Sequence, residues 1–153
     1  MVGDTFVVGC ALPDVCIFPE FNAESEDATQ PFASSALGIY SAGCGLDNTY
    51  IAYGHDEYMY QVLKGNKGVK LPEEALYIVR YHSLYPWHDA GAYQDLESDL
   101  DRRMKGWVKL FNQSDLYTKR DEHYTKERLA AMRTYYDGLI KKYAHPHPLY
   151  ASH

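Results

Sequence analysis

Hydrophobic and polar positions follow two different patterns along the chain, and the change comes near Leu46. Residues 1–45 are rich in glycine, proline, serine and aspartate and contain only short apolar runs. This composition predicts a loop-rich segment with room for one short hairpin. From residue 46 to residue 143 the apolar residues recur with helical spacing, and the prolines of 144–153 predict a non-helical tail. We therefore expect a single domain, 1–153, of the all-α class.

Four stretches within 46–143 have the spacing of amphipathic helices. The expected helices span about residues 47–64, 72–85, 96–115 and 125–143. A proline fits the first turn of a helix, so Pro72 predicts the start of the second. Pro86 should end that helix near Tyr85, because the residue before a proline disfavours helical geometry. Gly106 is expected to split or shorten the third helix, and Thr125 to cap the fourth.

Charge and cysteine content narrow the classes of function. The 153 residues carry a formal charge of −6 at pH 7, which argues against a nucleic-acid binder and favours a neutral polar substrate. Three cysteines without CxxC spacing argue against a disulfide framework or a cysteine-based zinc site. No signal peptide and no long apolar run is visible, so we expect a cytoplasmic protein that does not enter a membrane. Fifteen tyrosines supply apolar area with a polar tip, suited to a wet pocket or to a partner surface.

Three polar side chains fall on helix faces that should otherwise be apolar. They are His55, His82 and Asp115. Each comes from a different predicted helix, and each would be costly to bury without a partner. Taken singly, each is explained as well by an ordinary hydrogen bond at the edge of a core. Taken together, they form a ligand set for iron, manganese or zinc, and two histidines with one carboxylate are typical of iron. We expect the three side chains to meet.

Other candidate chemistry is weaker. Gly3 and Asp4 form a polar loop in which the glycine lets the backbone approach a ligand, although an ordinary Gly-Asp turn explains the pair as well. The His-Asp dipeptides that begin at His55 and His88 invite comparison with HD-type hydrolases, but neighbouring helical residues point about 100° apart. The sequence contains no nucleophile elbow, phosphate-binding loop or HExxH motif.

Four longer strings resemble motifs of the myo-inositol oxygenase family. They are GDTFVVGC at 3–10, YGHDEYMY at 53–60, RYHSLYPWH at 80–88 and FNQSDLYTK at 111–119. The resemblance runs from residue 2 to about Tyr143. It implies an all-helical, HD-domain-like fold with a centre of two iron ions, which converts myo-inositol and O₂ into D-glucuronate. Iron is therefore the expected cofactor, and the substrate is a neutral polyol.

The resemblance also assigns roles to single residues. The metal ligands that it implies are His55, His82 and Asp115. The substrate-binding residues that it implies are Gly3, Asp4, His82, Ser83 and Lys119. Lys119 is the expected catalytic residue, because its ammonium group would stabilise a developing alkoxide.

The chain departs from the family pattern on its N-terminal side. Family members carry a preceding segment with a histidine, a His-Asp pair and further substrate contacts, and this chain begins just before the GDT loop. We therefore expect an incomplete domain, inactive alone, whose exposed apolar helix faces allow an oligomer to form. A catalytically incomplete short form that acts as a binding or regulatory module is the alternative. A metal phosphohydrolase is disfavoured, because the sequence lacks a basic phosphate clamp.

Overall fold

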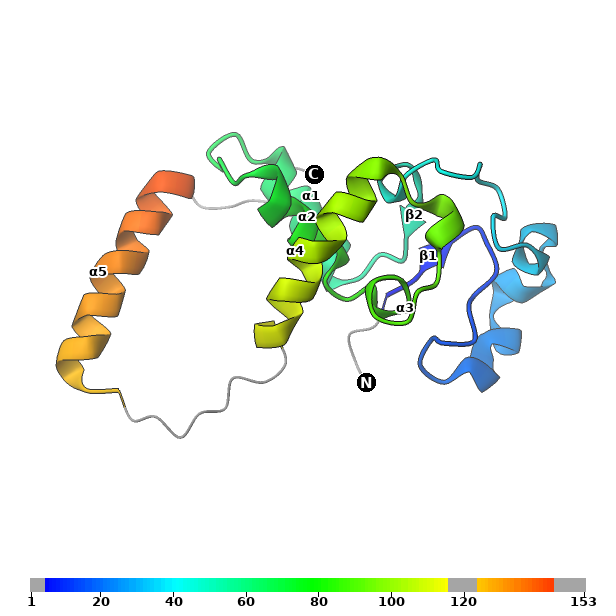
Figure 1. Ribbon diagram of the computed structural model, residues 1–153, viewed down its shortest axis with the longest axis horizontal. Coiled ribbons are helices and arrows are strands. Elements are labelled where there is room, and N and C mark those ends of the chain that lie inside the picture. The colour runs from blue at the N-terminus through cyan, green and yellow to red at the C-terminus, as the bar shows by residue number, and fades with distance from the viewer. Residues whose placement is uncertain (1–4, 116–123, 145–153) are drawn as a thin grey trace.

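The computed structural model of the chain describes residues 5–115 and 124–144. The elements in chain order, with η for short 3-10 helices, are β1 (Val7–Val8), η1 (Pro19–Glu24), η2 (Glu26–Thr29), η3 (Pro31–Ser34), η4 (Leu46–Asn48), β2 (Tyr50–Ile51), α1 (His55–Gly65), α2 (Glu73–Tyr81), α3 (Tyr85–His88), η5 (Gln94–Leu96), α4 (Asp99–Asp115) and α5 (Lys126–Tyr143). The predicted all-helical class is confirmed, and the sheet in the described residues has only two short strands (Figure 1). Within these ranges, no helix has both the length and the apolar character that a membrane crossing requires.

The N-terminal segment is loop-rich, as expected, but its strand does not belong to a local hairpin. β1 pairs antiparallel with β2, which places Val7 opposite Ile51 and Val8 opposite Tyr50. Between the two strands the chain forms the 3-10 helices η1 to η4. The strand pairing therefore ties the start of the chain to the segment that leads directly into α1.

The first helix begins at His55 and not at Asp47 as predicted. The Asp47 carboxylate does not cap α1, because tertiary partners hold it. Its Oδ1 accepts hydrogen bonds from Arg80 Nη1 and Tyr81 Oη, each at 2.8 Å. A capping preference is worth only about 1 kcal/mol, so a charge-assisted bond to a partly buried arginine can override it.

Pro86 does not have the role that the sequence predicted for it. α2 already ends at Tyr81, and Pro86 lies in the first turn of the short helix α3. Proline fits there because the first N–H groups of a helix have no helical partner. The chain therefore makes a sharp change of direction between α2 and α3, and His82 lies at this corner.

α4 begins at Asp99, later than predicted, because a reciprocal cap fixes its start. Ser98 N donates to Asp101 Oδ2 at 2.7 Å, and Asp101 N donates to Ser98 Oγ at 3.3 Å. This is the geometry of a capping box, with an aspartate in the place of the usual glutamate. Gly106 lies inside α4 and does not split it, so that expectation was wrong.

The core is built around three aromatic rings of α2 and α3. Tyr77, Tyr81 and Trp87 have ring centroids between 4.4 and 6.2 Å apart. Each ring is buried and donates a hydrogen bond from its polar tip to a carboxylate, which satisfies a group that would be costly to leave unpaired. The accepting residues are, in the same order, Asp101, Asp47 and Glu97, at 2.6, 2.8 and 2.6 Å. Part of the high tyrosine content therefore serves the core, although Tyr77 and Tyr81 also line a cavity of about 430 Å³.

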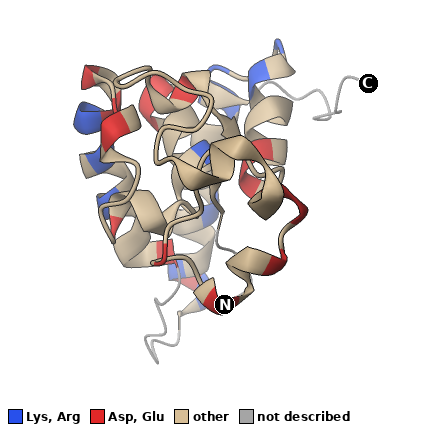
Figure 2. Cartoon of the chain, turned by 90° about the vertical axis from the view of Figure 1, so that its right-hand side faces the viewer, with Lys and Arg blue, Asp and Glu red and all other residues tan. Residues whose placement is uncertain are grey.

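An ion pair joins α1 to α2. Arg80 Nε lies 2.6 Å from Glu57 Oε2, and the two side chains are only 10% and 9% exposed. The Arg80 guanidinium also lies 4.6 Å from the centre of the Tyr60 ring. Acidic and basic positions are intermixed on the helices in the view of Figure 2. The Arg80–Glu57 pair matters most for the site, because it fixes the two helices that carry His55 and His82.

α5 stands apart from the core (Figure 1). Thr125 caps it as predicted, since Thr125 Oγ1 accepts from Arg128 N at 3.2 Å. None of its residues is buried. A backbone hydrogen bond of 2.8 Å from Lys70 N to Tyr143 O joins its end to the loop after α1. Its exposed large apolar side chains are those of Leu129, Tyr135, Tyr136 and Ile140.

Candidate metal centre

Two of the predicted ligands, His55 and His82, lie side by side. His55 is the first residue of α1, and His82 directly follows α2. Their Nε2 atoms are 3.1 Å apart, and the ring planes are 82° from each other. The pairing of α1 with α2 therefore brings together two imidazoles that are 27 residues apart in the sequence.

A backbone contact fixes the protonation of His82. Its Nδ1 lies 2.9 Å from the carbonyl oxygen of Val79. A carbonyl oxygen can only accept, so Nδ1 carries a proton and the neutral ring has its lone pair on Nε2. Metal-ligating histidines typically hold their second nitrogen in this way.

The space between the two rings suits a cation. Two lone pairs would repel at 3.1 Å, so without a metal one Nε2 carries a proton and donates to the other, and a cation that binds both nitrogens could take the place of that proton. A gap of 3.1 Å is short enough for both nitrogens to bind one ion, because a metal–imidazole bond is about 2.1 Å long. The two imidazoles therefore fit as neighbouring ligands of one ion.

Ser83 contacts both His55 and Thr5, near the start of the chain. Its Oγ lies 3.1 Å from Nε2 of His55, and its backbone oxygen accepts from Thr5 N at 3.0 Å. Both Ser83 and Thr5 are buried. Gly3 and Asp4 precede Thr5 in the sequence but lie outside the described residues. The predicted substrate contacts of Gly3, Asp4 and Ser83 stay predictions.

Asp115 does not join the two histidines. It is the exposed last residue of α4. α4 contacts His82 about one turn earlier, where the ring of Phe111 lies 5.9 Å from the His82 ring and Asn112 Nδ2 lies 3.2 Å from the His82 carbonyl oxygen. Among residues 5–115 and 124–144, no group of three or more histidine, cysteine, aspartate or glutamate side chains could hold a metal. Of the three side chains that we expected to lie together, His55 and His82 do so. The ligand role of Asp115 stays a prediction. Lys119 lies outside the described residues.

Asp56, the neighbour of His55, points elsewhere. It is 1% exposed, whereas His55 is exposed. One oxygen, Oδ1, accepts from Glu57 N at 2.8 Å, and the buried Oδ2 has no hydrogen-bond partner among the described residues. The two residues lie on different sides of α1, as the rotation of about 100° per helical residue predicts. An HD-type pairing of His55 with Asp56 is therefore not present.

Two polar residues lie behind His82: His88, which the sequence marked only as part of a His-Asp dipeptide, and Asn112, to which it assigned no role. His88 Nε2 lies 3.0 Å from the backbone oxygen of His82, and Asn112 Nδ2 lies 3.2 Å from the same oxygen. His88 is 3% exposed, and burial lowers its pKa below the ordinary value of a histidine, which favours the neutral ring. The available signal for Asn112 was its place four residues after the buried Val108, which puts both residues on the same face of α4.

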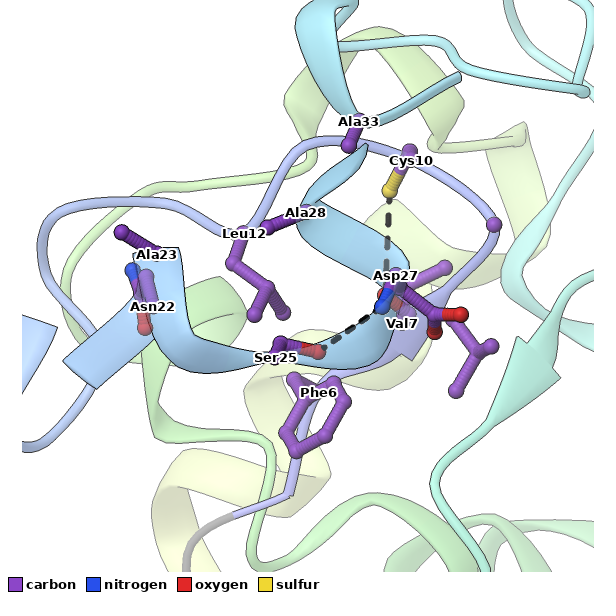
Figure 3. Close-up of a pocket in the computed structure, with 12 residues that line it drawn as sticks. Phe6, Val7, Cys10, Leu12, Asn22, Ala23, Ser25, Asp27, Ala28 and Ala33 are labelled. Atoms are coloured by element: carbon purple, nitrogen blue, oxygen red, sulfur yellow. Dashed lines mark hydrogen bonds between the residues drawn. The ribbon is translucent and has the colours of Figure 1, made fainter. Parts of the chain in front are cut away.

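A separate cavity of about 280 Å³ lies against the 3-10 helices of the N-terminal segment (Figure 3). Phe6, Leu12 and several alanines line it, together with Asn22, whose buried Nδ2 has no hydrogen-bond partner among the described residues. Burial raises the pKa of Cys10, another lining residue, to about 11. Its thiol is therefore protonated near pH 7, which makes it a poor nucleophile and metal ligand.

Comparisons with known proteins agree with the motifs. A family model described as myo-inositol oxygenase matches residues 1–149. The inositol oxygenase of Bos taurus is 46% identical over 144 residues, which are 94% of this chain and 49% of that protein. The enzyme of Danio rerio is 45% identical, with 94% and 50% covered. Inositol oxygenase 5 of Arabidopsis thaliana is 45% identical, with 94% and 44% covered. The chain thus spans about half the length of these curated relatives.

Proposed function

The chain belongs to the myo-inositol oxygenase family, and we propose that it serves the oxidation of myo-inositol by O₂ to D-glucuronate. In this proposal His55 and His82 are ligands of one iron ion of a two-iron centre. The observation that carries it is the Nε2–Nε2 separation of 3.1 Å, with His82 oriented by the Val79 carbonyl. The names of the relatives support the reaction, and the imidazole pair supports the metal.

Iron at this position would supply a Lewis acid for substrate hydroxyls and a redox centre for O₂. The two imidazoles would bind it through unprotonated Nε2 atoms. Two ligands do not complete a coordination sphere, so further ligands must come from outside the described residues or from side chains that move. Asp115 is our candidate for one of them.

The remaining predicted residues act on the substrate in this proposal. Ser83 shares the Nε2 atom of His55 with His82, so a metal bound at that nitrogen would free the serine hydroxyl to orient a hydroxyl of the substrate. Gly3 and Asp4 lie within two residues of the anchored Thr5, and two residues span only about 7 Å. They can therefore reach the same region, and Lys119 would stabilise a developing alkoxide.

A cytoplasmic location is part of the same proposal. All three cysteines are free thiols, which suits a reducing compartment.

Anaerobic titration of the full chain with Fe(II), and with Co(II) as a spectroscopic probe, tests the metal site. We expect His55→Ala and His82→Ala each to weaken binding at least about tenfold, because each removes a ligand. The matched control replaces the tail histidines together (His145→Ala, His147→Ala, His153→Ala) and should retain the affinity of the wild type. The reverse pattern would assign metal binding to the tail and refute the proposal.

Inositol-dependent O₂ consumption is the second readout. Turnover that requires both His55 and His82 would support the oxygenase. Iron binding without turnover would favour a binding or regulatory role instead, which the exposed His55 and the pair of only two ligands also allow.

A further inference from the structure

We propose that His88 and Asn112 are positioning residues for His82. Both donate a hydrogen bond to the backbone carbonyl of His82, and together they hold its imidazole in the orientation that a metal ligand needs. This inference rests on the proposed function, because it assigns the two residues to the same metal site.

The backbone carbonyl of His82 lies at a helix end, where no N–H group of the helix can donate to it. His82 is the C-cap residue that directly follows α2, and the last carbonyl groups at a helix end have no N–H partner within the helix. Here α3 and α4 supply the donors: His88 Nε2 at 3.0 Å and Asn112 Nδ2 at 3.2 Å. Three helices therefore converge on one backbone atom of a predicted ligand.

The contact with the His82 carbonyl indicates which ring nitrogen of His88 carries the proton. A carbonyl oxygen accepts and cannot donate, so the proposed hydrogen bond from His88 requires a proton on its Nε2. Asn112 Nδ2 lies 3.0 Å from that nitrogen. Because both atoms are donors, this contact is not a hydrogen bond between them. It is the spacing of two donors that share one acceptor with two lone pairs.

With this carbonyl held, little freedom is left to the His82 side chain. Its Nδ1 donates to Val79, and the ring packs edge-on against Phe111 at 5.9 Å. Only Nε2 remains, and it faces His55. Loss of a donor to the carbonyl would loosen the corner between α2 and α3, and the imidazole and the next residue, Ser83, would move with it. Ligand geometry is sensitive to such outer contacts.

A purely structural role makes a different prediction. If the two donors only satisfied the end of α2, their loss would lower stability and leave the metal affinity of the folded protein unchanged. Asn48 offers a matched control, because its Nδ2 also donates to a backbone carbonyl, that of Cys44, at 2.8 Å. Asn48 belongs to η4, which carries neither of the two histidines.

The experiment compares Asn112→Leu with Asn48→Leu in the full chain by Co(II) titration, visible absorption and thermal unfolding. We expect Asn112→Leu to bind Co(II) about tenfold more weakly and to change the absorption bands of the bound ion, whereas Asn48→Leu keeps both. An Asn112→Leu protein that is less stable but has wild-type affinity and absorption would overturn the inference.

Nitrogen-15 NMR of the histidine rings in the metal-free wild type gives a test that needs no variant. The inference requires a proton on Nε2 of His88 and on Nδ1 of His82. A His88 ring protonated only on Nδ1 would overturn it, even if Asn112→Leu fails to fold. A wild type that binds no Co(II) would refute the proposed function, while the ring protonation would still decide whether the two donors hold His82.

Discussion

Helices α4 and α5 have nearly the same length, and the sequence predicted an apolar stripe on both, but they have opposite environments. α4 has 17 residues and buries Met104 and Val108 against α2 and α3, whereas α5 has 18 residues and buries none. The spacing of apolar residues predicted a helix in both places, and both helices form. Periodicity therefore indicates which face of a helix is apolar, and it does not tell whether another element covers that face.

The two helices consequently owe their stability to different sources. α4 is held by side-chain burial and by the buried Asp101 at its first turn. α5 depends on its cap and on its intrinsic helix propensity, and such contributions are small in an isolated helix. Matched substitutions in the two helices should therefore differ strongly in effect.

Truncation of a methionine should give the largest contrast. Met104 is 6% exposed, so Met104→Ala removes buried volume and should lower the free energy of unfolding by about 2–5 kcal/mol. Met132→Ala in α5, where no residue is buried, should change it by less than about 0.5 kcal/mol. Urea unfolding measures both. Equal losses in the two variants would show that α5 is packed as firmly as α4.

Neutralisation of a carboxylate should give the next largest difference. Asp101 accepts hydrogen bonds from Leu46 N, Tyr77 Oη and Ser98 N, between 2.6 and 3.0 Å. Asp101→Asn puts a donor where an acceptor is needed and should cost about 2–3 kcal/mol. Asp137→Asn, at an exposed position of α5, is the control and should lie within about 0.5 kcal/mol of the wild type. A neutral effect at Asp101 would mean that this carboxylate is not the common acceptor of those donors.

Removal of the α5 cap should have the smallest effect, confined to that helix. Thr125→Ala deletes the acceptor for Arg128 N and should destabilise α5 by about 1 kcal/mol. Hydrogen exchange of the α5 amides should report this, while the α4 amides should not change. Thr134→Ala, inside the same helix, should instead slow exchange slightly, because alanine has the higher helix propensity. Faster exchange throughout α4 in Thr125→Ala would contradict the independence of the two helices.

The first residue of a helix can be predicted from the sequence when the groups that fix it are only a few residues apart. Thr125 was identified as a cap because its acceptor and the N–H group that it serves are three residues apart. The start of α4 could have been found in the same way, since Ser98 and Asp101 are also three apart. The start of α1 could not have been found in this way, because the Asp47 carboxylate binds Arg80, which is 33 residues further along the chain.

In the candidate metal centre, too, the sequence identified the candidate residues, and the packing of the helices decided which of them lie close together. Composition and motif identified His55 and His82 as unusual polar residues on apolar helix faces, and their family resemblance identified a chemistry for them. Their approach to 3.1 Å depends on the packing of α1 against α2, and the carbonyl of His82 depends on donors from α3 and α4. Asp115 was an equally good candidate in sequence, but it lies one helical turn beyond the contact of α4 with His82.

Residue types, and contacts within a few residues of each other, are enough to predict the helical class, the family and the side chains that are chemically able to bind a metal. Which of those side chains meet, which helix faces are covered and which groups orient His82 become known only from the tertiary structure. The reason is that a distance between two helices is set by the packing of many side chains at once, and no local pattern records it.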